Sequence, residues 1–137
     1  MTKNPEHGIA MPVIARIVRM VGGDALHIGT YGIGKMHADV EEELRSKEVL
    51  LDDMYDLPKM MPVASGGLHP GVVSDLIEKS GFDVQIQAGG GVSGHPEGVR
   101  AGAKALKQAV DASFEGIPLE EYAKDHEELK LALDKWM

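Results

Sequence analysis

The feature that most constrains this sequence is a unit that occurs three times: a short apolar run, then glycines, then a helical pattern. The apolar runs are ALHIG at 25–29, MPVAS at 61–65 and VQIQA at 84–88. Short runs of this kind bounded by glycine are typical of β-strands. Strands that alternate with helices are joined by right-handed crossovers and lie parallel in one sheet. The repeat therefore predicts an α/β fold whose strand ends lie along one edge.

Apolar residues at helical spacing fill the stretches between these strands. Asp39 is a candidate N-cap with acidic residues in the turn that follows. Proline stands near the start of several helical stretches, where its missing N–H costs little. The expected order is α-β-α-β-α-β-α-α, with helices at 8–21, 39–51, 69–81, 98–115 and 118–136.

Length, cysteine content and net charge limit the classes of protein to which this chain can belong. The 137 residues suffice for one modest domain, and they include no cysteine for disulfides or thiol chemistry. The net charge of −8 argues against nucleic acid as a partner. No apolar run is long enough to span a membrane, and the first residues do not resemble a signal peptide. We expect a cytoplasmic protein with no membrane partner.

The glycines after the strands indicate an anion site. They form three clusters, at 29–34, at 66–67 and at 89–91. Glycine lets backbone N–H groups approach an anion closely, and ligands of α/β folds bind beyond the carboxyl ends of the strands. Glycine after one strand is ordinary turn chemistry. Three clusters in register favour a phosphate site, whereas the G-x-G-x-x-G fingerprint of dinucleotide binding is incomplete.

Three side chains near these glycines carry usable chemistry. His27 lies in the first strand and could donate to a phosphate oxygen, or it could be a hydrogen-bonded core histidine. Lys35 ends the loop GTYGIGK; it is either a solvated surface lysine or a residue that closes over a bound anion. Ser65 offers a hydroxyl beside Gly66 and Gly67, or simply forms a turn. The remaining histidines after the loops match no zinc motif, so turn or helix-start roles are expected for His37, His69 and His95.

Four longer motifs together resemble a known family. HIGTYGIGKM, MPVASGGLHPG, QIQAGGGVSGHPEGVRAGAKALKQA and PLEEYAKDHEELKLALDKW are similar to the large subunit of ribulose-1,5-bisphosphate carboxylase/oxygenase, RuBisCO. The similarity is greatest to the archaeal kind, form III, and extends from about Asn4 to Trp136. It implies that residues 1–137 form the C-terminal segment of a (β/α)8 TIM-barrel domain, about strands six to eight plus C-terminal helices.

The resemblance also implies roles for individual residues. His27 corresponds to a histidine that binds a substrate phosphate, and Lys35 to the catalytic lysine of a mobile loop. Ser65, Gly66 and Gly67 correspond to the loop that holds substrate hydroxyl and phosphate groups. The segment formed by Gln87, Ala88, Gly89 and Gly90 corresponds to the loop that cradles the other phosphate. The implied reaction adds CO2 to ribulose 1,5-bisphosphate and yields two molecules of 3-phosphoglycerate; in the archaeal kind it serves nucleotide (AMP) salvage.

Part of the family's machinery is absent from these residues. The family holds Mg2+ with a carbamylated lysine, an aspartate and a glutamate in a motif GxDFxKxDE, which this sequence lacks. We therefore expect the chain alone to be inactive, and its partner to be the rest of a large subunit or a homo-oligomer. MPVAS and VQIQA are expected to be buried on both faces in the complete barrel. Two alternatives stay open: a non-catalytic fragment or split-subunit partner, and a RuBisCO-like enolase or isomerase.

Overall fold

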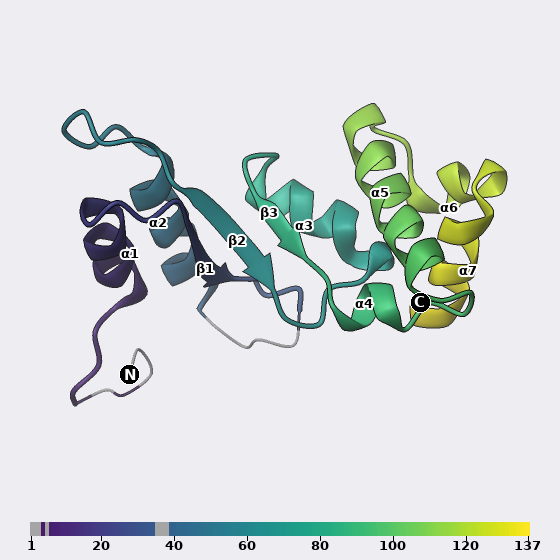
Figure 1. Cartoon of the computed structure of the whole chain (residues 1–137), viewed down its shortest axis with the longest axis horizontal. Helices are drawn as coiled ribbons and strands as arrows, with labels where there is room; N and C mark the ends of the chain where they lie inside the picture. The colour runs from purple at the N-terminus through teal and green to yellow at the C-terminus, as the bar shows by residue number, and fades with distance from the viewer. Residues whose placement is uncertain (1–3, 5, 35–38) are drawn as a thin grey trace.

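A parallel sheet of three strands forms the centre of the molecule. The computed structural model describes residue 4 and residues 6–34 and 39–137. Within these residues the strands are β1 (Ala25–Gly29), β2 (Met61–Ser65) and β3 (Gln85–Gln87), in the order β1-β2-β3. Figure 1 shows the sheet between α1 and α2 at one end and α5 to α7 at the other. The predicted α/β class and parallel pairing are confirmed.

Each predicted helical stretch contains a helix in the expected order, and the short helix at Gly90–Ser93 is one that the expected order did not include. Asp39 caps the helix that contains the acidic cluster, because its carboxylate accepts a hydrogen bond from the Glu41 N–H at 3.0 Å. The long alanine-rich helix ends at Gly116, whose φ of 68° is in the left-handed region that glycine adopts readily. The observed helices are α1 (Met11–Met20), α2 (Val40–Leu51), α3 (Val73–Ser80), α4 (Gly90–Ser93), α5 (Val99–Glu115), α6 (Leu119–Tyr122) and α7 (Glu127–Trp136), with 3-10 turns η1 (Pro70–Val72) and η2 (Ala123–Asp125).

The prediction of one continuous helix over 118–136 was wrong. The chain leaves the helical conformation at His126, whose φ and ψ are −133° and 88°. The His126 imidazole lies 2.7 Å from the Tyr122 carbonyl oxygen and its ring stacks on Tyr122, which stabilises the break. The break also lets Leu119 and Leu129 both pack in one core against α5. Tertiary packing thus outweighs the helical propensity of this stretch.

The two faces of the sheet differ sharply. On one face Ile28 and Ala64 are buried in a core with side chains of α1, α2 and α3. The other face carries residues from alternate positions of the same strands, and most of them are exposed: Ala25, His27, Met61, Gln85 and Gln87, with Ser65 half-buried and Val63 buried between its neighbours. The helices of this chain cover one face only, so the face that a complete barrel is expected to bury is uncovered here.

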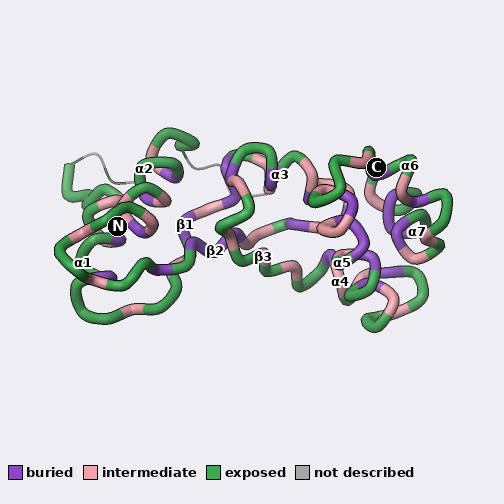
Figure 2. The backbone as a smooth tube through the Cα atoms, turned by 90° about the horizontal axis from the view of Figure 1, so that it is seen from above, coloured by how far each residue is buried: buried purple, intermediate pink, exposed green. Residues whose placement is uncertain are grey.

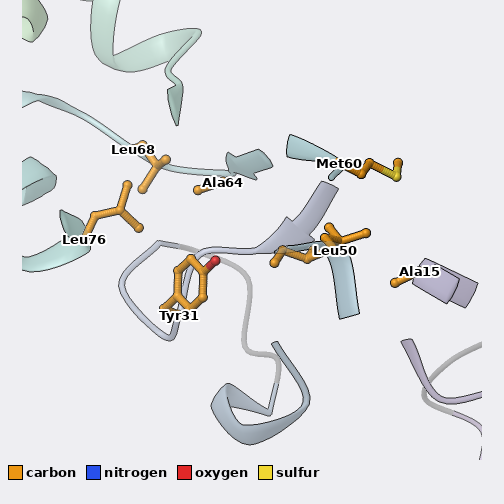
Figure 3. Close-up of a cluster of buried hydrophobic side chains, with 8 residues drawn as sticks. Ala15, Tyr31, Leu50, Met60, Ala64, Leu68 and Leu76 are labelled. Carbon is orange, nitrogen blue, oxygen red and sulfur yellow. The ribbon is translucent and has the colours of Figure 1, made fainter. Parts of the chain in front are cut away.

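Two apolar cores hold the helices in place. The first joins α1, α2 and α3 to the sheet, and Figure 3 shows Tyr31 and Leu50 near its middle, with Leu76 to one side and Met60 to the other. The second joins α3, α5, α6 and α7 around Val73 and Leu129. In Figure 2 the buried segments follow these two clusters along the length of the molecule. None of the described helices is long and apolar enough to cross a membrane.

Candidate functional site

A cavity of about 850 Å³ lies where the strands end. All three strands run parallel, so their carboxyl ends open on the same side of the sheet. The cavity is lined by glycines and a few polar or aromatic side chains: Ile33, Gly34, Ser65, Gly66, Gly67, Leu68, His69, Gln87, Gly89, Gly90, Gly91 and Trp136. The sequence-predicted segments after β2 and β3 thus lie around one space.

His27 and Ser65 meet across the two strands that carry them. The His27 Nδ1 atom lies 2.7 Å from the Ser65 hydroxyl oxygen. Both residues are on the exposed face of the sheet, since His27 is in register with Val63, two positions before Ser65. His27 is therefore an exposed histidine rather than the core histidine of the alternative interpretation. A hydroxyl can donate or accept, so the pair can present either an N–H or an O–H to a ligand oxygen.

The loop after β1 packs directly against the loop after β2. The Gly34 N–H donates to the Thr30 hydroxyl at 3.0 Å, which turns the loop back. A Cβ at Gly34 would collide with the Gly66 carbonyl oxygen, so only glycine permits this contact. Lys35 and His37, the next predicted residues of interest, lie outside the described residues.

The three consecutive glycines after β3 have different surroundings. A Cβ added at Gly89 or Gly90 would meet nothing within 4 Å, so both residues border open space at the cavity. A Cβ at Gly91 would lie 2.6 Å from the His69 Cα atom and would also collide with the Leu68 carbonyl oxygen. Gly91 is thus required for packing, whereas the first two glycines leave room for a ligand.

A buried carboxylate lies behind the loop that follows β1. Glu43 in α2 is only 2% exposed, and neither of its carboxylate oxygens has a hydrogen-bond partner of good geometry. Burial raises the pKa of Glu43, and the nearby backbone amides, Tyr31 first among them, offset part of this rise. The adjacent Tyr31 has a positive φ of 54° and a hydroxyl without a partner. Burial and the charge of Glu43 raise the pKa of Tyr31 to about 12.

Sequence reasoning missed two residues of the cavity wall. His69 and Trp136 line the cavity, and their rings stack with centroids 5.6 Å apart. No local pattern links them, because one follows β2 and the other ends α7. His95, by contrast, is buried and structural: its Nε2 donates to the Glu128 carbonyl at 2.9 Å and its Nδ1 accepts from the Glu97 N–H at 3.1 Å.

The described residues do not fit a metal centre. Among residue 4, 6–34 and 39–137, no three His, Cys, Asp or Glu side chains come together in a way that could hold an ion. The polar groups of the cavity lining are instead the glycine backbone, the Ser65 hydroxyl, the Gln87 amide and the His69 imidazole. Such groups suit an anion rather than a cation.

Comparison with known proteins identifies the family. The model of the ribulose bisphosphate carboxylase large chain, catalytic domain, matches residues 1–136. A ribulose bisphosphate carboxylase of Pyrococcus furiosus is 56% identical over 135 residues, which are 98% of this chain and 32% of that protein. The crystal structure of octameric Rubisco from Pyrococcus horikoshii superposes with a TM-score of 0.94 at 50% identity, covering 98% of this chain and 32% of that one.

A rubisco-like protein from Alicyclobacillus acidocaldarius is also similar, with a TM-score of 0.90 at 33% identity. The superposition covers 100% of this chain and 34% of the rubisco-like protein. The chain spans about a third of the length of the relatives it matches. The resemblance to archaeal RuBisCO noted from the motifs is confirmed. The chain belongs to the family of the ribulose bisphosphate carboxylase large-chain catalytic domain.

Proposed function

We propose that residues 1–137 are the C-terminal segment of a RuBisCO barrel domain, about strands six to eight, and that they serve a ribulose-bisphosphate carboxylase. The observation that carries this proposal is the cavity at the carboxyl ends of the strands, where Gly89 and Gly90 border open space. Membership of the family and the archaeal relatives support the same assignment.

Each residue predicted from the sequence has a defined task in this proposal. The amides of Gly89 and Gly90, with Gln87 and Ala88, hold one phosphate of the sugar bisphosphate. Ser65, Gly66 and Gly67 hold substrate hydroxyl and phosphate groups. His27 donates to a phosphate oxygen from the exposed face of β1. Because α4 has only four residues, its dipole adds little, and the individual N–H groups supply most of the attraction.

Lys35 is the proposed catalytic residue of this segment. An ammonium group placed beside the carboxylate that forms on CO2 addition would stabilise that developing charge. The complete reaction also needs enolisation, hydration and carbon–carbon cleavage, for which residues outside this chain are required. The Mg2+ that RuBisCO enzymes use would likewise be held by other residues, because the described part of this chain offers no ligand set.

A second candidate is a RuBisCO-like enolase or isomerase, favoured by the similarity to the rubisco-like protein. The loop lysine Lys35 favours the carboxylase over this second candidate, since RuBisCO-like relatives usually vary at that position. A third candidate, a non-catalytic or split-subunit partner, would keep the phosphate contacts and lose the chemistry.

The test is a barrel reconstituted from this chain and the front part of an archaeal large subunit. Lys35→Ala should lower carboxylation kcat by at least about 100-fold with little change in KM, because its contact forms in the transition state. Lys59→Ala, an exposed lysine before β2, is the control and should leave kcat unchanged. An unchanged kcat for Lys35→Ala would contradict its catalytic role, and reconstituted barrels that bind the bisphosphate without turnover would favour the non-catalytic candidate.

A further inference from the structure

The wall formed by His69 and Trp136 has no task in the proposed function. Trp136 is the last residue of α7, and His69 lies between β2 and η1. Their rings are nearly parallel, at an interplanar angle of 14°, and both side chains line the cavity. The stack thus connects the C-terminal helix with the loop after β2.

The same two residues contact α4 at both of its ends. His69 packs against Gly91 in the first turn, where even a Cβ on the glycine would lie 2.8 Å from the His69 Cβ. At the other end, a Cβ on Gly94 would lie 3.5 Å from the Trp136 ring, and the Lys135 ammonium donates to the Gly94 carbonyl. α4 also packs on α5, where a Cβ at Gly102 would collide with the Val92 carbonyl oxygen, and the stacked pair contacts α4 in addition to this helix.

His69 is an unusual choice for a residue that only fills space. Its Nδ1 atom is buried and has no hydrogen-bond partner, which is unfavourable compared with an apolar ring. Burial lowers the pKa of His69, so the imidazole that stacks on the indole is neutral near pH 7. The Lys135 ammonium lies 5.4 Å from the centre of the Trp136 ring on the same helix, so a second positive charge on His69 would be repelled.

We propose that His69 and Trp136 are positioning residues for the candidate anion site: the stacked pair holds α4 so that the amides of Gly89 and Gly90 face the loop after β2. This inference rests on the proposed phosphate-binding role of that loop. A Cβ at Gly89 or Gly90 would meet nothing within 4 Å, so the closely packed neighbours Gly91 and Gly94 help to set the direction of these two residues. An amide that turns away from its productive direction loses most of its hydrogen bond to an anion.

The test is a titration of the full chain with inorganic phosphate, followed by the backbone amide NMR signals of Gly89 and Gly90. Trp136 is the only tryptophan in the sequence, so its fluorescence gives a second signal from the cavity wall in the unaltered chain. The variants are Trp136→Ala and His69→Ala, which remove the stack from either side, and Trp136→Phe, which keeps an aromatic ring. His126→Gln is the matched control, because it removes a ring from the Tyr122 stack outside this cavity.

Removing the stack should weaken phosphate binding about 3- to 10-fold, the effect of one aromatic pair on affinity. Trp136→Phe should recover most of this loss, and His126→Gln should bind phosphate as the unaltered chain does. Amide signals of the second core report whether each variant is folded, and if one alanine variant unfolds, the other carries the test. Unchanged phosphate affinity in a folded Trp136→Ala or His69→Ala chain would overturn the positioning role alone. An unaltered chain whose Gly89 and Gly90 signals do not respond to phosphate would overturn the anion site and the positioning role together.

Discussion

The three consecutive glycines after β3 differ in what surrounds them. Gly89 and Gly90 border the cavity, and Gly91 makes room for His69 and for the Leu68 carbonyl. The same distinction applies at the loop after β1, where Gly34 allows two loops to touch. At the scale of a residue, the free space around the Cα atom decides whether a glycine borders the cavity or packs against its neighbours.

The substitutions Gly90→Ala and Gly91→Ala should therefore differ in their effect on stability. Gly91→Ala should lower the free energy of unfolding by about 1–3 kcal/mol, since the new methyl group overlaps His69. Gly90→Ala should leave stability equal or slightly higher because alanine favours helix, and Gly90→Val should abolish phosphate binding by filling the ligand space. Thermal unfolding and phosphate titration of the variants check this. Equal destabilisation by both alanines would contradict the assigned surroundings.

Glu43 should make the stability of the chain depend on pH. Its pKa is raised in the folded state above the ordinary 4.5, so the unfolded chain loses this proton first and stability falls as the pH rises from about 4.5 through the folded-state pKa. Glu43→Gln removes the charge and should stabilise the protein by about 1 kcal/mol at pH 7 but not at pH 4. Denaturant unfolding at pH 7 and pH 4 measures the free energy of unfolding of the variant and of the unaltered chain. Glu48→Gln, on the exposed face of α2, is the control. If Glu43→Gln stabilised the protein equally at pH 4 and pH 7, the charge of Glu43 would not be the cause of the stability difference.

At the scale of the element, Glu128 of α7 binds residues of α5 and of the segment between α4 and α5. The Glu128 carboxylate binds the Lys104 ammonium at 2.5 Å and the Gln108 amide at 2.9 Å, both from α5. Its backbone carbonyl accepts from His95, which lies between α4 and α5. Gln108 in turn accepts from the Leu129 N–H at 3.0 Å. The joint between α5 and α7 therefore combines polar contacts of Glu128 with apolar packing of Leu129.

The joint should weaken in acid. The hydrogen bonds from Lys104 and Gln108 hold the pKa of Glu128 at about 2, below its ordinary value of 4.5. Its contribution to stability is therefore present above pH 4.5 and disappears as the pH falls towards 2. Glu128→Gln should lower the melting temperature at pH 7, and the difference from the unaltered chain should be much smaller near pH 2, where Glu128 is about half protonated. Glu127→Gln, which alters the same first turn of α7 without these contacts, controls for the helix dipole. A melting-temperature difference that persists unchanged at pH 2 would argue against this ion pair.

At the scale of the molecule, the sheet and the helices leave surfaces uncovered. Within the described residues β1 and β3 each pair with one strand only, so both present an unpaired edge. Beside β3, a groove of about 340 Å³ is lined mostly by apolar side chains of α3, β3, α5 and the segment between α3 and β3, including the exposed Phe82 and Phe114. Unpaired edges and apolar grooves favour association.

The purified chain should consequently be marginally stable or should associate. Its apparent melting temperature should rise with protein concentration, because association stabilises the folded state. Sedimentation velocity combined with thermal unfolding over a range of concentrations checks this. A monomer that melts sharply and independently of concentration would contradict it.

The same purified chain should not carboxylate ribulose 1,5-bisphosphate. The described residues hold no metal-ligand cluster, and the sequence lacks the motif in which the family holds its metal. Fixation of labelled CO2 into 3-phosphoglycerate is the assay, with an intact archaeal enzyme as the positive control. Steady turnover by this chain alone would refute the prediction.

The sequence by itself determined the α/β class, the three strands and most helix positions, because periodicity, caps and prolines act within a few residues. It also located the glycine segments around the cavity, since parallel strands bring their carboxyl ends together whatever the details of packing.

Only the tertiary structure decided which glycines border the open cavity, because that depends on how closely His69 approaches Gly91. It also decided the break at His126 and the burial of Glu43 behind Tyr31. The His69–Trp136 stack joins residues that are far apart along the chain. Such contacts arise from the packing of whole elements, so no local pattern of residues encodes them.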